Sequence, residues 1–198
     1  MRHGLIVALA LTGAALVTTD SRASLSYTVV FDALLEESTA ATVATAMDEH
    51  AVWEDGRIVT YTHAHVDDVL AGSAGHDVWI RALGGEVGDI GQQVEGEATF
   101  TMGHRYVLFL KPNAQNTMSV VARAQGEFPL VTDDTKSLRV PSTLRPVALP
   151  PRPDVVTRVQ ARAPEAAQPA ISVLAGKSVE DTRKLVQGAW ARTHAPSR

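Results

Sequence analysis

The dipeptide Asp55-Gly56 constrains the fold of this chain more than any other short feature of its sequence. Asp-Gly supplies the positive φ angles that a tight hairpin turn requires, so it is a strong local signal for a β-hairpin. Residues 41–50 before it are rich in β-branched and small apolar side chains, and residues 58–70 after it alternate in polarity with a period of two. The sequence therefore predicts two antiparallel strands joined at this turn.

The second of these strands has two different faces. Because successive side chains of a strand point to opposite sides, one face carries small and β-branched residues: Thr60, Thr62, Ala64 and Val66. The opposite face carries polar and aromatic residues: Tyr61, His63, His65 and Asp67. We expect this histidine-bearing face to lie toward solvent.

Further short strands are predicted along the chain up to residue 131. Their ranges are 76–83, 105–111, 118–124 and 126–131, and the strand 105–111 is bounded by Gly103 on one side and by Pro112 and Asn113 on the other. A short helix is predicted over 31–38, because Phe31, Leu34 and Leu35 recur at helical spacing. Five or six strands with turn signals between them predict a mainly β domain over 24–131, built as a small barrel or sandwich.

Composition changes after about Thr132. Seven of the ten prolines lie between Pro141 and Pro169, together with several arginines, which indicates an extended linker over 132–176 with no core of its own. The chain then continues into an amphipathic helix, predicted over 177–193, that begins with a capping pattern at Ser178 and Asp181. This helix is expected to dock on the barrel.

Residues 1–23 have the composition of a secretory signal peptide. Arg2 precedes an apolar run from Leu5 to Val17, and small residues lie at the predicted cleavage site after Ala23. We expect a secreted or periplasmic protein with no stable membrane anchor after cleavage. The chain has no cysteine, so its stability would come from packing alone.

Charge argues against nucleic-acid binding. The whole chain has a net charge of −4, and removing residues 1–23, which hold two arginines and one aspartate, would bring it to about −5. The predicted barrel also shows no basic stripe that could follow a phosphate backbone.

His63 and His65 are the metal-binding candidates of the sequence. Two residues apart on a strand, they project from one face and could share a zinc ion, with Asp67 as a possible third ligand on the same face. A surface pair of histidines without function has the same pattern, and the sequence names no further ligand.

Aromatic residues supply one candidate partner-binding side chain. Trp53, beside the predicted turn, is placed to be an exposed anchor. The other aromatic residues are interpreted mainly as core: Trp79, Phe100, Tyr106, Phe109 and Phe128.

The glycine-rich segment 84–96 resembles a phosphate-binding loop only in its glycine content. Its glycines do not have the spacing of the known phosphate-binding fingerprints, its charges are acidic, and no helix is predicted after it. A connection that needs glycine for its backbone angles explains it better, with a calcium site at Glu86 and Asp89 as the alternative.

No grouping of nucleophile, base and orienting residue is recognisable as a catalytic motif. The dyad His76-Asp77 opens a predicted strand, and Ser73 lacks the surroundings of a nucleophile elbow. We therefore expect a non-enzymatic module without a cofactor, which binds a protein partner in the envelope or outside the cell. A metal-binding protein that uses His63 and His65 is the alternative hypothesis.

Residues 31–131 also carry a resemblance. The segments WEDGRIVTYTHAHVDDVLAG, GGEVGDIGQQVEG and HRYVLFL, followed by QGEF, are similar to a pattern found in a group of exported bacterial proteins. That pattern in turn resembles the netrin-like domain of the tissue inhibitors of metalloproteinases. The resemblance implies an OB-like antiparallel barrel of five to six strands, in which segment 84–96 is a structural signature. Those inhibitors chelate the protease zinc through an N-terminal cysteine, which this chain lacks, so the resemblance implies the fold more than the inhibition.

Overall fold

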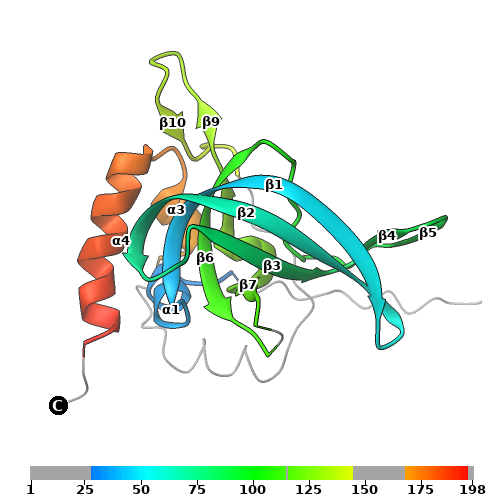
Figure 1. Cartoon of the computed structure of the whole chain (residues 1–198). Coiled ribbons are helices and arrows are strands. Elements are labelled where there is room, and N and C mark those ends of the chain that lie inside the picture. The colour runs from blue at the N-terminus through cyan, green and yellow to red at the C-terminus, as the bar shows by residue number, and fades with distance from the viewer. Residues whose placement is uncertain (1–27, 115, 145–167, 196–198) are drawn as a thin grey trace, which may run out of the picture.

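The computed structural model describes residues 28–114, 116–144 and 168–195, and the fold is mainly β, as predicted (Figure 1). A six-stranded sheet has the order β1 (Ala40–Glu54), β2 (Arg57–Gly72), β3 (Asp77–Leu83), β7 (Met118–Val120), β6 (Arg105–Pro112) and β8 (Glu127–Pro129). Strand β1 also pairs with β6, and all these pairings are antiparallel except that of β3 with β7. Two small hairpins are added, β4 (Gly85–Val87) with β5 (Ile90–Gln92) and β9 (Val131–Thr132) with β10 (Leu138–Arg139).

The predicted hairpin at Asp55-Gly56 is confirmed and is the longest feature of the sheet. Asp55 and Gly56 have φ angles of 48° and 76°, as a two-residue turn of this kind requires, and β1 and β2 pair from Ala40 with Gly72 to Glu54 with Arg57. The register of this pair shifts between Ala46 and Asp48. This bulge changes which face of the sheet the later side chains of β1 occupy.

Two hydrophobic clusters lie on opposite sides of strand β6. Val107 and Phe109 belong to one cluster and Tyr106, Leu108 and Leu110 to the other, so the strand is buried on both faces. This explains why its sequence is an almost continuous apolar run rather than an alternating one.

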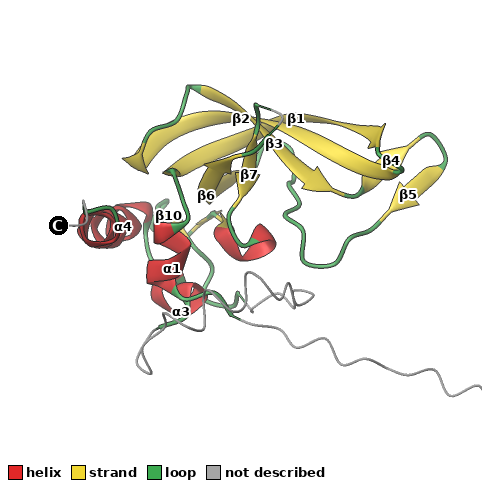
Figure 2. Ribbon diagram, turned by 90° about the horizontal axis from the view of Figure 1, so that it is seen from below, coloured by secondary structure: helices red, strands yellow, loops and turns green. Residues whose placement is uncertain are grey.

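Three helices close the first of these clusters. They are α1 (Phe31–Glu36), α3 (Ala170–Leu174) and α4 (Val179–Thr193), and Figure 2 shows them gathered at one end of the sheet, opposite the β4–β5 hairpin. Leu34, Leu174 and Val186 are fully buried there. The predicted N-terminal helix and the predicted docking of the C-terminal helix are thus confirmed.

Two segments differ from the prediction within the domain. The glycine-rich segment 84–96 contains the hairpin β4–β5 and is not a plain connection. The strand predicted over 118–124 ends at Val120, because Ala122 and Arg123 have φ angles of 54° and 57°, and the 3₁₀ helix η1 (Arg123–Gly126) follows. Positive φ angles at two successive residues are incompatible with an extended strand.

The predicted linker 132–176 is described only at its two ends, and residues 145–167 lie outside the described part. Both ends differ from an extended segment without a core. Val140 is fully buried and follows β10, and Leu174 of α3 belongs to the cluster beneath the helices.

The predicted signal peptide, residues 1–23, lies outside the described residues. Within residues 28–114, 116–144 and 168–195, no helix is long and apolar enough to cross a membrane.

Candidate functional site

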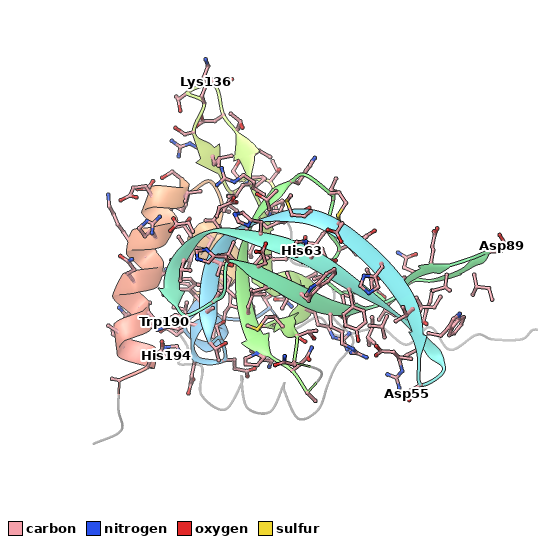
Figure 3. All side chains as sticks on the ribbon, in the orientation of Figure 1. Asp55, His63, Asp89, Lys136, Trp190 and His194 are labelled. Carbon is pink, nitrogen blue, oxygen red and sulfur yellow. The ribbon has the colours of Figure 1, made fainter. Side chains whose placement is uncertain are left out.

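One face of strands β1, β2 and β3 carries a group of titratable and aromatic side chains. Register pairs place these residues in rows: Asp48 with His63 and Trp79, His50 with Tyr61 and Arg81, and His65 with Asp77. We call this surface the His63 face and define it by Asp48, His50, Tyr61, His63, His65, Asp77, Trp79 and Arg81. Figure 3 shows His63 near the middle of the sheet.

Alternation and the β1 bulge together produce the His63 face. In β2, Thr62, Ala64 and Val66 are buried, so the histidines between them point outward, as predicted from the sequence. In β1, a strict alternation would put Asp48 on the same face as the buried Ala46. The register shift after Ala46 moves Asp48 to the face of His63 instead.

Four side chains form a chain of polar contacts at the centre of the face. Nδ1 of His63 lies 3.0 Å from Oδ2 of Asp48, and Nε2 of His63 lies 3.2 Å from Oδ1 of Asp77. The same Oδ1 atom of Asp77 lies 3.2 Å from Nδ1 of His65. Strand β3 therefore places Oδ1 of Asp77 within hydrogen-bonding distance of both predicted histidines.

These contacts shift the ionisation of the cluster. The pKa of His63 is raised, first by its hydrogen bond to Asp48 and then by that to Asp77, although partial burial opposes the shift. The pKa of Asp77 is lowered, with the hydrogen bond to His65 as the largest cause. Both directions favour a positive charge on the imidazole between the two carboxylates.

Trp79 lies beside this cluster and is 39% exposed, so the prediction that it belongs to the core is wrong. Its ring stacks on that of His63 with a centroid distance of 5.0 Å, and His50 meets it edge-on at 5.3 Å. The buried residues of β3 are Val78 and Ile80, which alternate with the outward-facing Trp79. Tyr106, Phe109 and Phe128 are buried as predicted, and Phe100 packs against the second cluster.

A second network fixes the end of the face near the hairpin turn. Arg81 donates to Oε2 of Glu54 at 2.7 Å, and the hydroxyl of Tyr61 donates to Oε1 of the same carboxylate. The pKa of Glu54 is lowered, mainly by the hydrogen bond from Tyr61 and then by that from Arg81. The ring of Tyr61 in turn stacks against His50 at 5.4 Å. These contacts restrain the aromatic side chains around Trp79.

Asp67, the possible third metal ligand, is engaged elsewhere. Its Oδ2 atom accepts hydrogen bonds from Thr45 at 2.8 Å and from Arg105 at 3.1 Å, across β1 toward β6. Asp77 on the neighbouring strand lies between the histidines instead. Within the described ranges, no group of three or more histidine, aspartate or glutamate side chains is placed so that it could hold a metal ion.

Trp53, the predicted anchor, is 50% exposed and lies beside the turn. It pairs with the buried Ile58, which puts it on the face of β2 opposite to His63. Trp53 and Trp79 therefore do not form one surface.

The acidic residues of segment 84–96 lie apart from the histidines. Asp89 marks the tip of the projecting β4–β5 hairpin in Figure 3, and Glu86 is exposed on β4. They do not belong to a metal-binding group of the described chain.

Sequence reasoning missed Asp48 and Trp79 as members of the site, and it considered Asp77 only in a dyad with His76. For Trp79 a signal was present, since Asp77, Trp79 and Arg81 alternate with Val78, Ile80 and Ala82 as they would in a half-exposed strand. For Asp48 no local signal exists, because its face depends on the bulge.

Comparison of the chain with protein-family models, with curated proteins and with solved structures found no match.

Proposed function

We propose that this protein is a non-enzymatic binding module of the periplasm or the extracellular space, and that it binds a protein partner through the His63 face. The observation that carries the proposal is Trp79, a large aromatic side chain that is 39% exposed at the centre of a face whose neighbouring side chains are held by mutual contacts. Export is supported by the sequence of residues 1–23.

We also propose that the sheet is an OB-like barrel. Its support is the pairing order β1-β2-β3-β7-β6, in which β6 pairs with β1 again and β3 runs parallel to β7. OB-folds bind their ligands on the face of their second and third strands. Trp79, His63 and Asp77 lie on the second and third strands here.

The chemistry of the face suits a protein partner. Tryptophan, tyrosine and arginine dominate the residues that contribute most to protein–protein affinity, and Trp79, Tyr61 and Arg81 are neighbours on this surface. Their contacts to Glu54 and His50 fix their rotamers before binding, which reduces the entropy lost on association.

Other ligand classes fit the face less well. The side chains of Asp48 and Asp77 are 63% and 55% exposed, and they would repel a nucleic-acid backbone. Both ring nitrogens of His63 lie against carboxylates, so the ring is not positioned to activate a hydroxyl nucleophile.

The test compares two exposed tryptophans on opposite faces. Residues 24–198, and the variants Trp79→Ala and Trp53→Ala, are used to capture proteins from the envelope and culture fluid of the producing organism. The retained protein is then purified, and its affinity for each variant is measured by calorimetry. Trp79→Ala should weaken binding by 2 kcal/mol or more, about thirtyfold, and Trp53→Ala should stay close to the parent protein.

Four outcomes would contradict the proposal. Equal binding by Trp79→Ala and the parent would show that the partner does not bind the His63 face. Loss of binding only in Trp53→Ala would show that the partner binds the opposite face. Retention of the protein on envelope polysaccharide, with no protein bound, would show that the ligand is a polysaccharide and not a protein. Turnover of a substrate that one substitution abolishes would overturn the non-enzymatic assignment.

A further inference from the structure

The position of Asp77 between His63 and His65 has a chemical consequence. A neutral imidazole has one N–H donor and one lone pair, whereas an ionised carboxylate only accepts hydrogen bonds. His63 lies between two carboxylates, at 3.0 Å from Asp48 and 3.2 Å from Asp77, so a neutral ring would point its lone pair at a carboxylate oxygen. The arrangement is favourable only when a cation lies between the ring and one carboxylate.

A proton is one such cation and accounts for the observed contacts, and a divalent metal ion that displaces it is another. Nε2 of His63, Nδ1 of His65 and Oδ1 of Asp77 are the donor types that bind zinc, and they converge from two neighbouring strands. Asp48 contacts the other ring nitrogen of His63. A carboxylate in that position orients a metal-binding imidazole and increases its basicity.

We propose that His63, His65 and Asp77 form a binding site for a divalent transition metal of the zinc type, with Asp48 as the carboxylate that orients His63. Oδ1 of Asp77 now lies at hydrogen-bonding distance, 3.2 Å, from a nitrogen of each ring, and in this arrangement no group of the described residues could hold a metal ion. Binding requires a rotation of Asp77 and His65, whose side chains are 55% and 49% exposed and therefore have room to turn. Three protein ligands leave a further position for solvent.

The third ligand of this site lies on strand β3, beside the strand that carries the histidines. The sequence alone had indicated a third ligand on the same strand as the histidines. Asp67 lies on the same strand and the same face as His65, but its carboxylate is bonded to Thr45 and Arg105. Asp67 and Asp77 therefore provide a pair of substitutions for comparison, because each removes one carboxylate charge and only Asp77 contacts His65.

The experiment is calorimetric titration of ZnCl₂ into residues 24–198 and into five variants. The parent protein should bind one zinc ion, and His63→Ala, His65→Ala and Asp77→Asn should each weaken binding at least a hundredfold. Asp48→Asn should weaken it about tenfold or more, the effect of losing an orienting carboxylate. Asp67→Asn should bind as the parent does. Circular dichroism of each variant verifies that the sheet is retained.

A second measurement does not depend on the heat of binding. Zinc at a hundredfold excess over its dissociation constant should raise the thermal midpoint of the parent protein, because a ligand that binds only the folded state stabilises it. The midpoints of His63→Ala and Asp77→Asn should not change with zinc.

Two results would overturn the proposal. One is the absence of saturable zinc binding by the folded parent protein. The other is equal weak binding by the parent, Asp77→Asn and Asp67→Asn, which would show adventitious binding by surface histidines. Neither result bears on partner binding by Trp79, since the metal experiment uses the isolated protein.

Discussion

At Gly85, an added methyl group would occupy space that strand β2 already fills. The residue has a φ angle of 124°, and an ideal Cβ there would lie 2.2 Å from Oγ1 of Thr60 and 3.1 Å from Cβ of Ala51. The same hydroxyl of Thr60 donates to the carbonyl of Gly84 at 2.7 Å. Glycine is needed at this position for both its backbone angle and its lack of a side chain.

We therefore expect Gly85→Ala to lower the free energy of unfolding by about 2–4 kcal/mol, from backbone strain and overpacking together. Gly91→Ala is the control in the same hairpin, because Gly91 has no positive φ angle and only ordinary contacts to Glu86. Its effect should stay within about 0.5 kcal/mol. Urea unfolding monitored by tryptophan fluorescence measures both, and equal stabilities would refute the close-approach explanation.

At the scale of elements, helix α4 combines a polar start with a buried stripe. Oγ of Ser178 accepts a hydrogen bond from the backbone N–H of Asp181 at 3.0 Å, which confirms the predicted N-cap. Farther along, Val186 and Ala189 are buried against the cluster shared with α1 and the sheet. Near the end of the helix, Nε2 of His194 lies 3.1 Å from the carbonyl of Ser38.

Ser178→Ala should destabilise the protein by about 1 kcal/mol, because it leaves a helix N–H without its side-chain acceptor. Ser178→Thr should retain most of the stability, since threonine keeps the hydroxyl that accepts from the Asp181 N–H and donates to the Asp181 carboxylate. Denaturant midpoints of the two variants against the parent provide the measurement. A loss of the same size in both would mean that Ser178 stabilises through another contact.

At the scale of the whole molecule, one partly buried acid couples stability to pH. Burial raises the pKa of Glu127, on β8, to about 7, although a hydrogen bond from the backbone N–H of Thr99 at 3.1 Å opposes the shift. The folded state therefore binds this proton more tightly than the unfolded state, whose glutamate has a pKa near 4.5. The resulting stabilisation is fully present below pH 4.5 and is lost as the pH rises through 7.

Between pH 4.5 and pH 8 this one group should remove roughly 3 kcal/mol of stability. Glu127→Gln should be close to the parent protein at pH 5 and more stable than it at pH 8, because glutamine keeps the acceptor oxygen without the charge. The exposed Glu95, replaced by glutamine, is the control and should follow the parent at each pH. A parent and a Glu127→Gln variant with parallel pH profiles would contradict the assignment.

Much of the local structure was predictable from the sequence because it depends on neighbours along the chain. The turn at Asp55-Gly56, the alternating faces of β2 and the cap at Ser178 each involve a few adjacent residues. The site was predictable only in part. His63 and His65 were identified, but Asp67 was taken as the possible third ligand and Trp79 as core.

The sequence by itself determined the long hairpin turned at Asp55-Gly56, which face of β2 is polar and where the last helix begins. Only the tertiary structure decided that β3 lies beside β2 with Asp77 opposite His65, and that a bulge turns Asp48 toward His63. The physical reason is that strand register depends on the packing of both hydrophobic clusters at once. A shift of one residue exchanges the buried and exposed faces, and no local pattern specifies where that shift occurs.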